Sequence, residues 1–524
     1  MSDSSITSRA RLEEFCRQRV GARRLILASN RGPVEYHLTE DRQLQARRGS
    51  GGVVTALGAL SQCIEVDWIA SAMGEGDRLA AQRASGSPIK EPLIGENLYL
   101  NFIISPRQTY HKFYGIFCNP LLWFLQHYMW STSRTPNIDH VVYDAWENGY
   151  KPVNQAFAEA IVAAAAQSDP SPIVLLNDYH LYLAAGYIRE KRPDLVIQHF
   201  THIPWPDPRY WQLLPRFMLL AILRGLCAAD IVGLQTRRDV ISFLRCCQSF
   251  LEEAKVNIEQ QTVQIGPRRV RVQAYPISVD VPTLKQLVTS DAFKEYQGKL
   301  RPLLGEPTIV RVDRAEPSKN LLRGFKAFDT LLTRYPRFLG KVKLIAFIVP
   351  SRTQVKAYQR YSQETIEAID EINRKYGTGA WHPIDYFYEN NYLQAIAGMH
   401  LYDVLLVNAV IDGMNLVAKE GPVVNGQDGV LVLSETAGAC EELGEYALTV
   451  APADIEGTVQ ALYRALTMAP EERHQRAAGL KETIEKADLN NWLLHLLEDA
   501  VSLAEARSQS ASAGNAPHRP PRPG

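Results

Sequence analysis

Two basic side chains, Arg314 and Lys319, stand five residues apart between a short apolar run at 308–312 and an amphipathic stretch at 321–335. Two cations that converge across such a turn can offset the negative charges of a diphosphate. A solvated loop that happens to be charged would have the same composition. On this stretch alone, a diphosphate site and a charged surface loop both stay open.

Polar residues also follow apolar runs elsewhere in the chain. Asp178 comes after the run 173–176, His202 comes after the run 196–200, and Arg352 occupies the same kind of position in the second half. If the runs are parallel strands, their carboxyl ends meet at the edge where α/β proteins bind ligands. A lone histidine is more often structural, but polar clusters after two neighbouring runs favour a functional interpretation.

The segment DGMNLVAKE at 412–420 carries the most specific pattern. Gly413 permits a tight turn, and backbone N–H groups at the helix start that follows can bind a sugar or a phosphate. Those N–H groups belong to Met414, Asn415 and Leu416. Asp412 and Glu420 are acceptors suited to sugar and ribose hydroxyls. The structural alternative is a capped helix start with a solvated acidic residue one turn later.

A glycine cluster that includes Gly51 and Gly52 precedes another apolar stretch. Glycines ahead of a helix let the backbone approach a phosphate at the helix N-terminus. An ordinary turn would use the same glycines, so the pattern supports phosphate binding and simple turn formation about equally.

These residues must be positioned by strands and helices that alternate along the chain. Continuous apolar runs predict strands of a parallel sheet covered on both faces. The predicted strands are 25–28, 67–70, 98–104, 173–176, 196–200, 231–234, 270–274, 308–312, 343–349, 403–407, 430–433 and 447–450. The clearest predicted helices are 153–166, 321–335, 354–374, 455–468 and 492–506. The expected fold class is α/β, with two facing, doubly wound Rossmann-like units and a cleft between them.

The domain boundaries follow from this alternation and from the proline-flanked segment near 279–283. We expect an N-terminal extension, two Rossmann-like domains, a helix that packs back on the N-terminal domain, and a disordered tail rich in Ser, Ala, Arg and Pro. Their predicted ranges are 1–22, 23–280, 281–485, 486–507 and 508–524.

Composition limits the kinds of partner. The 524 residues carry 57 basic and 57 acidic side chains, for a formal net charge of +0, so a general nucleic-acid binder or a binder of anionic membranes is not expected. Seven cysteines without a Cys-x-x-Cys pair predict a reducing compartment and no structural zinc. The first residues lack the pattern of a signal peptide, so a cytoplasmic location is expected.

The motifs together resemble the trehalose-6-phosphate synthase family over about residues 23–500. Members of this family are retaining glycosyltransferases of the GT-B fold that move glucose from a nucleotide diphosphate to glucose 6-phosphate. The matching motifs, in chain order, are SNR at 29–31, GG at 51–52, DYHL at 178–181, HIPWP at 202–206, DR at 313–314 with Lys319, PSR at 350–352 and DGMNLVAKE at 412–420.

The resemblance implies a role for each matching position. The catalytic set that it implies is His202, Arg314, Lys319 and Asp412. The donor-binding set is Gly51, Gly52, Arg314, Lys319, Met414, Asn415, Leu416 and Glu420, with Arg314 and Lys319 on the diphosphate and Glu420 on the ribose. The acceptor-binding set is Arg31, Tyr114, Trp123, Asp178 and Arg352, of which Asp178 would hold acceptor hydroxyls.

Two departures from the family pattern concern the acceptor. Ile411 stands where members usually have Arg before the Asp-Gly-Met-Asn turn, and residues 68–72 read WIASA instead of a Trp-x-Gly-Trp run. Both changes, with HIPWP and the segment LSET at 433–436, resemble the pseudo-glycosyltransferase that makes the validamycin skeleton. That enzyme joins a nucleotide-activated cyclitol to an aminocyclitol phosphate through nitrogen. Arg31, Tyr114 and Trp123 follow the trehalose pattern instead.

The favoured mechanism is substitution on one face of the donor sugar, because the family pattern supplies no carboxylate nucleophile. Alternatives are the same fold acting on an aminocyclitol phosphate, a glucosylglycerol-phosphate synthase, and a non-catalytic sugar-phosphate sensor. We expect no cofactor and no metal, since Arg and Lys meet the diphosphate charge and Asp139-His140 is an isolated pair. The expected partners are the small molecules NDP-glucose and a sugar phosphate. Nucleobase preference and a homo-oligomeric state stay open.

Overall fold

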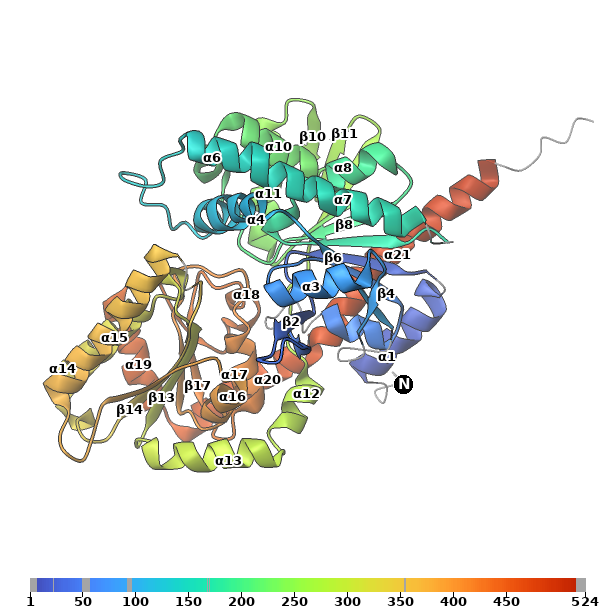
Figure 1. Cartoon of the computed structure of the whole chain (residues 1–524). Coiled ribbons are helices and arrows are strands. Elements are labelled where there is room, and N and C mark those ends of the chain that lie inside the picture. The colour runs from blue at the N-terminus through green and yellow to red at the C-terminus, as the bar shows by residue number, and fades with distance from the viewer. Residues whose placement is uncertain are drawn as a thin grey trace, which may run out of the picture.

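The computed structural model describes residues 7–21, 23–49, 57–91, 97–166, 168, 170–352 and 355–514. The chain forms two α/β lobes, each built around its own sheet, with the N-terminal lobe in blue and green and the C-terminal lobe in yellow and orange (Figure 1). The predicted fold class is confirmed.

The sheet of the N-terminal lobe contains a parallel core extended by hairpins at its edges. Its strands, in spatial order, are β10 (Ala254–Asn257), β11 (Thr262–Ile265), β12 (Arg268–Ala274), β9 (Ile231–Leu234), β8 (Val196–Phe200), β7 (Ile173–Asn177), β1 (Leu25–Ser29), β4 (Val66–Ser71), β6 (Leu98–Ile103) and β5 (Ile89–Lys90). A separate hairpin pairs β2 (Val34–Leu38) with β3 (Leu44–Arg48).

The sheet of the C-terminal lobe is parallel throughout its described strands. Its spatial order is β15 (Ile384–Tyr388), β14 (Lys343–Val349), β13 (Thr308–Arg314), β16 (Val404–Val407), β17 (Val430–Ser434) and β18 (Leu448–Val450). This is the 3-2-1-4-5-6 order of a dinucleotide-binding sheet, in which ligands bind where the order reverses. Here that point lies between β13 and β16.

Helices cover both sheets. Those of the N-terminal lobe are α1 (Ser8–Phe15), α3 (Glu75–Ala84), α4 (Arg107–Tyr110), the π-helical segment His111–Trp123, α5 (Phe124–Gln126), α6 (His140–Ala145), α7 (Lys151–Ala166), α8 (Ala184–Lys191), α9 (Pro208–Trp211), α10 (Arg216–Leu226) and α11 (Arg237–Phe250). Those that follow are α12 (Val281–Leu287), α13 (Asp291–Leu300), α14 (Leu321–Arg334), α15 (Lys356–Tyr376), α16 (Tyr392–His400), α17 (Val417–Val424), α18 (Cys440–Leu443), α19 (Ile455–Leu466), α20 (Pro470–Lys486) and α21 (Leu489–Gly514).

Every strand predicted from an apolar run is present, with its ends shifted by at most two residues. Strands without such a run were missed: β2 and β3, the short edge strand β5, the hairpin β10–β11, and β15, whose sequence mixes polar and aromatic residues. β1, β7 and β17 are buried along their whole length, which explains why each is apolar up to its last residue. β8 is equally buried but contains Gln198 and His199.

The last helix, α21, runs from the C-terminal lobe along the N-terminal lobe (Figure 1). On α21, Trp492 Nε1 donates to the carbonyl of Tyr275 at 3.0 Å, and Asp499 accepts from the Tyr275 hydroxyl at 2.6 Å. The helix extends to Gly514, so the prediction of a disordered tail from residue 508 is wrong for residues 508–514. The sequence SQSASAG has no proline to stop the helix there; residues 515–524 lie outside the described part of the chain.

No helix among the described residues is long and apolar enough to cross a membrane.

Candidate active site

The loops after β13 and β16 bring the predicted diphosphate cations to the cleft side of the C-terminal sheet. Arg314 ends β13, and Lys319 lies in the turn that follows. Lys319 Nζ is paired with Asp412 Oδ2, and the Lys319 side chain is only 12% exposed. Arg314 is 53% exposed, and its Nη1 lies 3.4 Å from Glu316 Oε1. Each cation therefore rests against an internal carboxylate, with Arg314 far more open to a ligand.

The loop after β16 brings the two lobes into contact. A Cβ on Gly413 would lie 2.1 Å from the carbonyl oxygen of His202, so only glycine fits this approach. Asn415 adopts a left-handed conformation, with φ at 77°, and its Nδ2 donates to Asp412 Oδ2 at 3.0 Å. The loop thus holds Asp412 between Lys319 and Asn415, opposite the strand end that carries His202.

Asp178 occupies a strained position directly after β7. Its φ is 71° and its ψ is 173°, a region that side chains rarely adopt and that costs on the order of 1–3 kcal/mol. Its backbone N–H donates to Phe200 at 2.7 Å, and its Oδ1 accepts from the His202 backbone N–H at 3.2 Å. Burial raises the pKa of Asp178 to about 6, although the backbone N–H groups of His202 and Tyr179, together with Arg352 and Arg314, oppose the rise. Both C-terminal-lobe cations therefore act on this N-terminal-lobe carboxylate.

His202 follows β8 and is neutral at physiological pH. Burial lowers its pKa to about 3, and its Nε2 lies 3.4 Å from Asn177 Oδ1. A neutral imidazole can exchange a hydrogen bond with a sugar hydroxyl, but it does not contribute a positive charge.

Arg352 crosses from the C-terminal lobe to the N-terminal lobe. Its Nε donates to Asn119 Oδ1 at 3.2 Å, and its Nη1 donates to Glu316 Oε1 at 2.8 Å and to the Tyr358 hydroxyl at 2.9 Å. The guanidinium lies 4.7 Å from the ring centre of Trp123. Trp123 is buried, so in this structure its ring packs against the Arg352 guanidinium and does not present a face to solvent.

The other predicted acceptor residues lie on the N-terminal-lobe side. Tyr114, on the π-helical segment, stacks between Tyr110 and His180. Its ring centre lies 5.6 Å from that of Tyr110 and 6.0 Å from that of His180. Arg31, in the loop after β1, has its Nη1 3.2 Å from Glu35 Oε1. The loops after β1 and β7 flank the reversal of strand order in this sheet, which is where ligands of such folds bind.

The remaining residues predicted to bind the donor lie near the start of α17. Met414 is buried and Leu416 half-buried in the loop before the helix, while Glu420 lies on the helix and accepts from the Tyr392 hydroxyl at 2.9 Å. Burial raises the pKa of Glu420. Gly51 and Gly52 lie outside the described residues.

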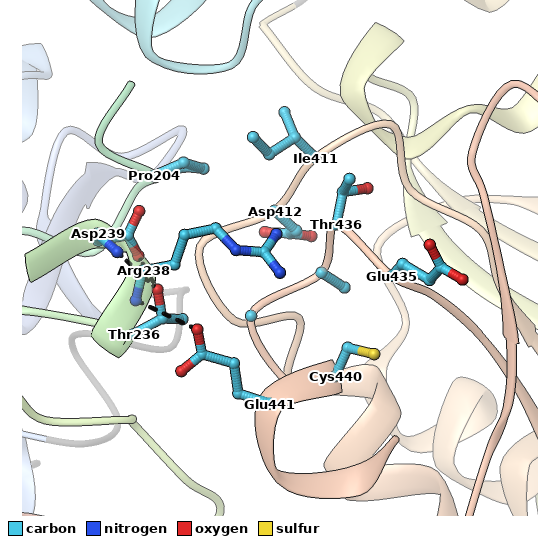
Figure 2. Close-up of a pocket in the computed structure, with 12 residues that line it drawn as sticks. Pro204, Thr236, Arg238, Asp239, Ile411, Asp412, Glu435, Thr436, Cys440 and Glu441 are labelled. Carbon is cyan, nitrogen blue, oxygen red and sulfur yellow. Dashed lines mark hydrogen bonds between the residues drawn. The ribbon is translucent and has the colours of Figure 1, made fainter. Parts of the chain in front are cut away.

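A cavity of about 120 Å³ lies between the lobes beside this loop, lined by Ile411, Asp412, Thr436 and the start of α11 (Figure 2). The guanidinium of Arg238 extends from α11 toward Asp412 and Thr436 and pairs with no described carboxylate. Backbone N–H groups of Arg237 and Arg238 donate to Glu441 across the lobe boundary at 3.0 and 3.2 Å. The cavity is thus lined by the apolar side chain of Ile411 from the C-terminal lobe and by the cation Arg238 from the N-terminal lobe.

Three residues of this cleft escaped the sequence analysis: Glu316, Asn119 and Arg238. Glu316 lies inside the motif that contains Arg314 and Lys319, so its place between two cations was a usable signal. Asn119 lies between the predicted residues Tyr114 and Trp123, but nothing in that segment marks this amide as functional, and Arg238 lies on a helix that none of the motifs covers. Among the described residues, no group of three or more His, Cys, Asp or Glu could hold a metal ion, and Asp139 caps α6 by accepting from Val141 N at 2.9 Å.

The arrangement can bind two anionic molecules. Arg314 and Lys319 lie at and just after the carboxyl end of β13, while Asp178 and Tyr114 belong to the N-terminal lobe, which Arg352 reaches through Asn119. The cations of this cleft therefore suit anionic ligands bound between the lobes.

Comparison with known proteins places this chain in a family. The family model described as "Glycosyltransferase family 20" matches residues 23–502. A bifunctional trehalose-6-phosphate synthase/phosphatase of Thermoproteus tenax is 32% identical over 501 residues, which are 93% of this chain but 64% of that protein. A validamine 7-phosphate valienyltransferase of Streptomyces hygroscopicus subsp. jinggangensis is 28% identical over 493 residues, covering 93% of this chain and 96% of the relative.

Solved structures agree with the sequence matches. An Escherichia coli trehalose-6-phosphate structure bound with UDP-2-fluoro glucose superposes with a TM-score of 0.77 at 28% identity, covering 91% of this chain and 99% of that one. An α,α-trehalose-phosphate synthase (UDP-forming) of Burkholderia xenovorans in complex with glucose-6-phosphate has a TM-score of 0.76 at 26% identity, with coverage of 91% and 99%. Together with the two facing α/β lobes, these matches show that the chain is a GT-B glycosyltransferase and belongs to glycosyltransferase family 20.

Proposed function

We propose that this enzyme transfers glucose from a nucleotide diphosphate-glucose to glucose 6-phosphate, with retention, to give trehalose 6-phosphate. The observation that supports this most directly is the convergence, in one cleft, of the cations Arg314, Lys319 and Arg352 with the carboxylate Asp178. The relatives named for trehalose-6-phosphate synthesis, and the neighbours bound to UDP-2-fluoro glucose and to glucose-6-phosphate, support the choice of substrates.

On this proposal, the donor lies against the C-terminal lobe. Arg314 and Lys319 bind the diphosphate, which displaces Asp412 from Lys319 and leaves that carboxylate to accept from sugar hydroxyls. Glu420 accepts from the ribose. His202 and the backbone N–H groups of Met414, Asn415 and Leu416 bind the rest of the donor sugar. Gly51 and Gly52 contact the diphosphate.

The acceptor lies against the N-terminal lobe. Arg352 and Arg31 bind its phosphate, supported by Tyr114 and Trp123, and Asp178 accepts from its hydroxyls. The anomeric hydroxyl of the acceptor attacks the donor carbon from the face that the diphosphate leaves. The bond from that carbon to the diphosphate oxygen breaks, and the leaving oxygen takes the acceptor proton. Stabilisation of the developing diphosphate charge by preorganised cations is the main catalytic contribution.

Asp178 fits a hydroxyl-binding role because its carboxylate is largely ionised at neutral pH. Burial raises its pKa to about 6, and Arg352 and Arg314 limit the rise. The experiment that tests the proposal is a product assay that crosses UDP-, GDP- and ADP-glucose with glucose 6-phosphate. Release of nucleoside diphosphate that depends on glucose 6-phosphate, with trehalose 6-phosphate as product, is expected. Release without dependence on that acceptor would refute it.

A second candidate keeps the donor site and changes the acceptor to an aminocyclitol phosphate. The apolar wall that Ile411 gives to the interlobe cavity favours it, as does the 28% identity to the valienyltransferase. An aminocyclitol phosphate in the same product assay separates the two candidates, because the coupled product then contains a C–N bond. We also propose that the reaction needs no metal, since Arg314 and Lys319 supply the charge that offsets the diphosphate.

A further inference from the structure

Glu316 is a fully buried carboxylate that none of the proposed substrate contacts uses. It is 0% exposed and lies in the turn between Arg314 and Lys319. Its Oε1 accepts from Arg352 Nη1 at 2.8 Å and from the Ser351 hydroxyl at 2.7 Å, and lies 3.4 Å from Arg314 Nη1. Its Oε2 is buried without a hydrogen-bond partner among the described residues. One oxygen therefore holds one guanidinium nitrogen from each of two arginines.

The two arginines belong to different substrates. On the proposed function, Arg314 binds the donor diphosphate and Arg352 binds the acceptor phosphate. Arg352 further donates to Asn119 Oδ1 at 3.2 Å, and the same oxygen accepts from the Tyr179 hydroxyl at 2.8 Å. Tyr179 directly follows Asp178. The contacts thus run without a break from the donor cation, through Glu316 and Arg352, to the wall of the acceptor site in the other lobe.

The Glu316 carboxylate stays ionised in this position. Burial by itself would raise the pKa of Glu316, but Arg314, Arg352 and Lys319 overcome this and lower the pKa to about 2. Without the carboxylate, the two guanidiniums would repel one another, and each could rotate about its own long side chain. Each arginine keeps other N–H groups outside the contact with Glu316, so orientation by Glu316 does not prevent phosphate binding.

We propose that Glu316 is a positioning residue that fixes the donor arginine and the acceptor arginine at one spacing, so that the two anionic substrates are brought into register for transfer. The proposal rests on the proposed function and deepens it. Glu316 does not touch either substrate, because it is completely buried. Its effect is on how often the bound pair reaches the reactive geometry, and therefore on kcat more than on KM.

Glu316→Gln tests the proposal, because it keeps the shape and removes the charge. Misplacement by about 1 Å costs about 100-fold in rate, so we expect kcat to fall about 100-fold while KM for both substrates changes less than about threefold. A purely structural role would lower the yield of folded protein without this split. The matched control is Asp230→Asn. Asp230 is a buried carboxylate that also holds two arginines, Arg189 at 2.9 Å and Arg507, at the opposite end of the N-terminal sheet.

Wild-type kcat in folded Glu316→Gln would overturn the proposal, as would an equal loss of kcat in Asp230→Asn. If Glu316→Gln does not fold, Glu316→Asp is the deciding variant. It keeps the negative charge but shortens the side chain by one methylene, which moves the carboxylate away from the arginines. A tenfold or greater loss of kcat at unchanged KM is then expected, and a wild-type kcat overturns the proposal. Failure of the proposed function looks different: the unaltered chain itself would show no release of nucleoside diphosphate with glucose 6-phosphate.

Discussion

Removal of the Arg314 guanidinium is expected to slow transfer strongly while leaving the fold intact. Arg314 is 53% exposed, and its only ion pair among the described residues is a 3.4 Å contact to Glu316, which keeps a shorter bond from Arg352. Glu316 is buried, but it keeps the bonds from Arg352 and from the Ser351 hydroxyl, so its charge stays paired and we expect the variant to fold. Loss of one preorganised charge at the leaving group costs about 2–4 kcal/mol in the barrier, which is a factor of about 30 to 1,000.

The assay is the release of nucleoside diphosphate at saturating glucose 6-phosphate, with donor concentration varied, for the unaltered enzyme and for Arg314→Ala. Arg360→Ala is the control, because Arg360 is 82% exposed on α15 of the same lobe and pairs only with Glu364 among the described residues. Thermal unfolding of each variant separates catalysis from stability. If Arg314→Ala turned over like the unaltered enzyme at saturating donor, the assignment of this cation to the leaving diphosphate would be refuted.

Three other predictions follow from the same geometry. Burial raises the pKa of Asp178 from 3.8 to about 6, so the cost of its charge to folding is absent below pH 3.8 and complete above pH 6. Asp178→Asn should therefore stabilise the unliganded chain by about 3 kcal/mol at pH 8 but not at pH 3.5, and it should abolish transfer. Unchanged stability at pH 8 would be the contrary result. Gly413→Ala places a Cβ 2.1 Å from the His202 carbonyl oxygen, so it should separate the lobes and lose most activity at a stability cost of about 1–3 kcal/mol, which kinetics and thermal unfolding would measure. Activity should persist in EDTA; a complete loss that Mg²⁺ restores would contradict the proposal of metal independence.

The strands that form the sheets could be predicted from the chain because they are buried on both faces. β1, β7 and β17 are covered throughout, and their sequences are apolar runs that end in a single polar residue, so they stand out against the polar segments around them. Edge hairpins such as β2–β3 and β10–β11 have exposed faces and mixed sequences, and the same reasoning could not find them. The end of α21 was missed because composition alone cannot separate an alanine- and serine-rich helix from a tail.

The residues of the candidate site also fall into those that the sequence predicts and those that it does not. Arg314, Lys319, Asp412 and Asp178 were found because parallel strands place functional groups at their carboxyl ends, and each of these residues lies in the segment that follows an apolar run. Local order along the chain was therefore enough to single out each residue, and the resemblance to the family grouped them into one site.

Their partners were decided only by the tertiary structure. The pairing of Lys319 with Asp412, the contact of Gly413 with His202, and the sharing of Glu316 by two arginines all join segments that sequence distance or motif spacing does not relate. Such pairings depend on where the lobes pack against one another and on which buried charges then need a partner. A linear pattern records the types of the residues and their positions on strands, but the electrostatic environment of each arises only when the two sheets face each other.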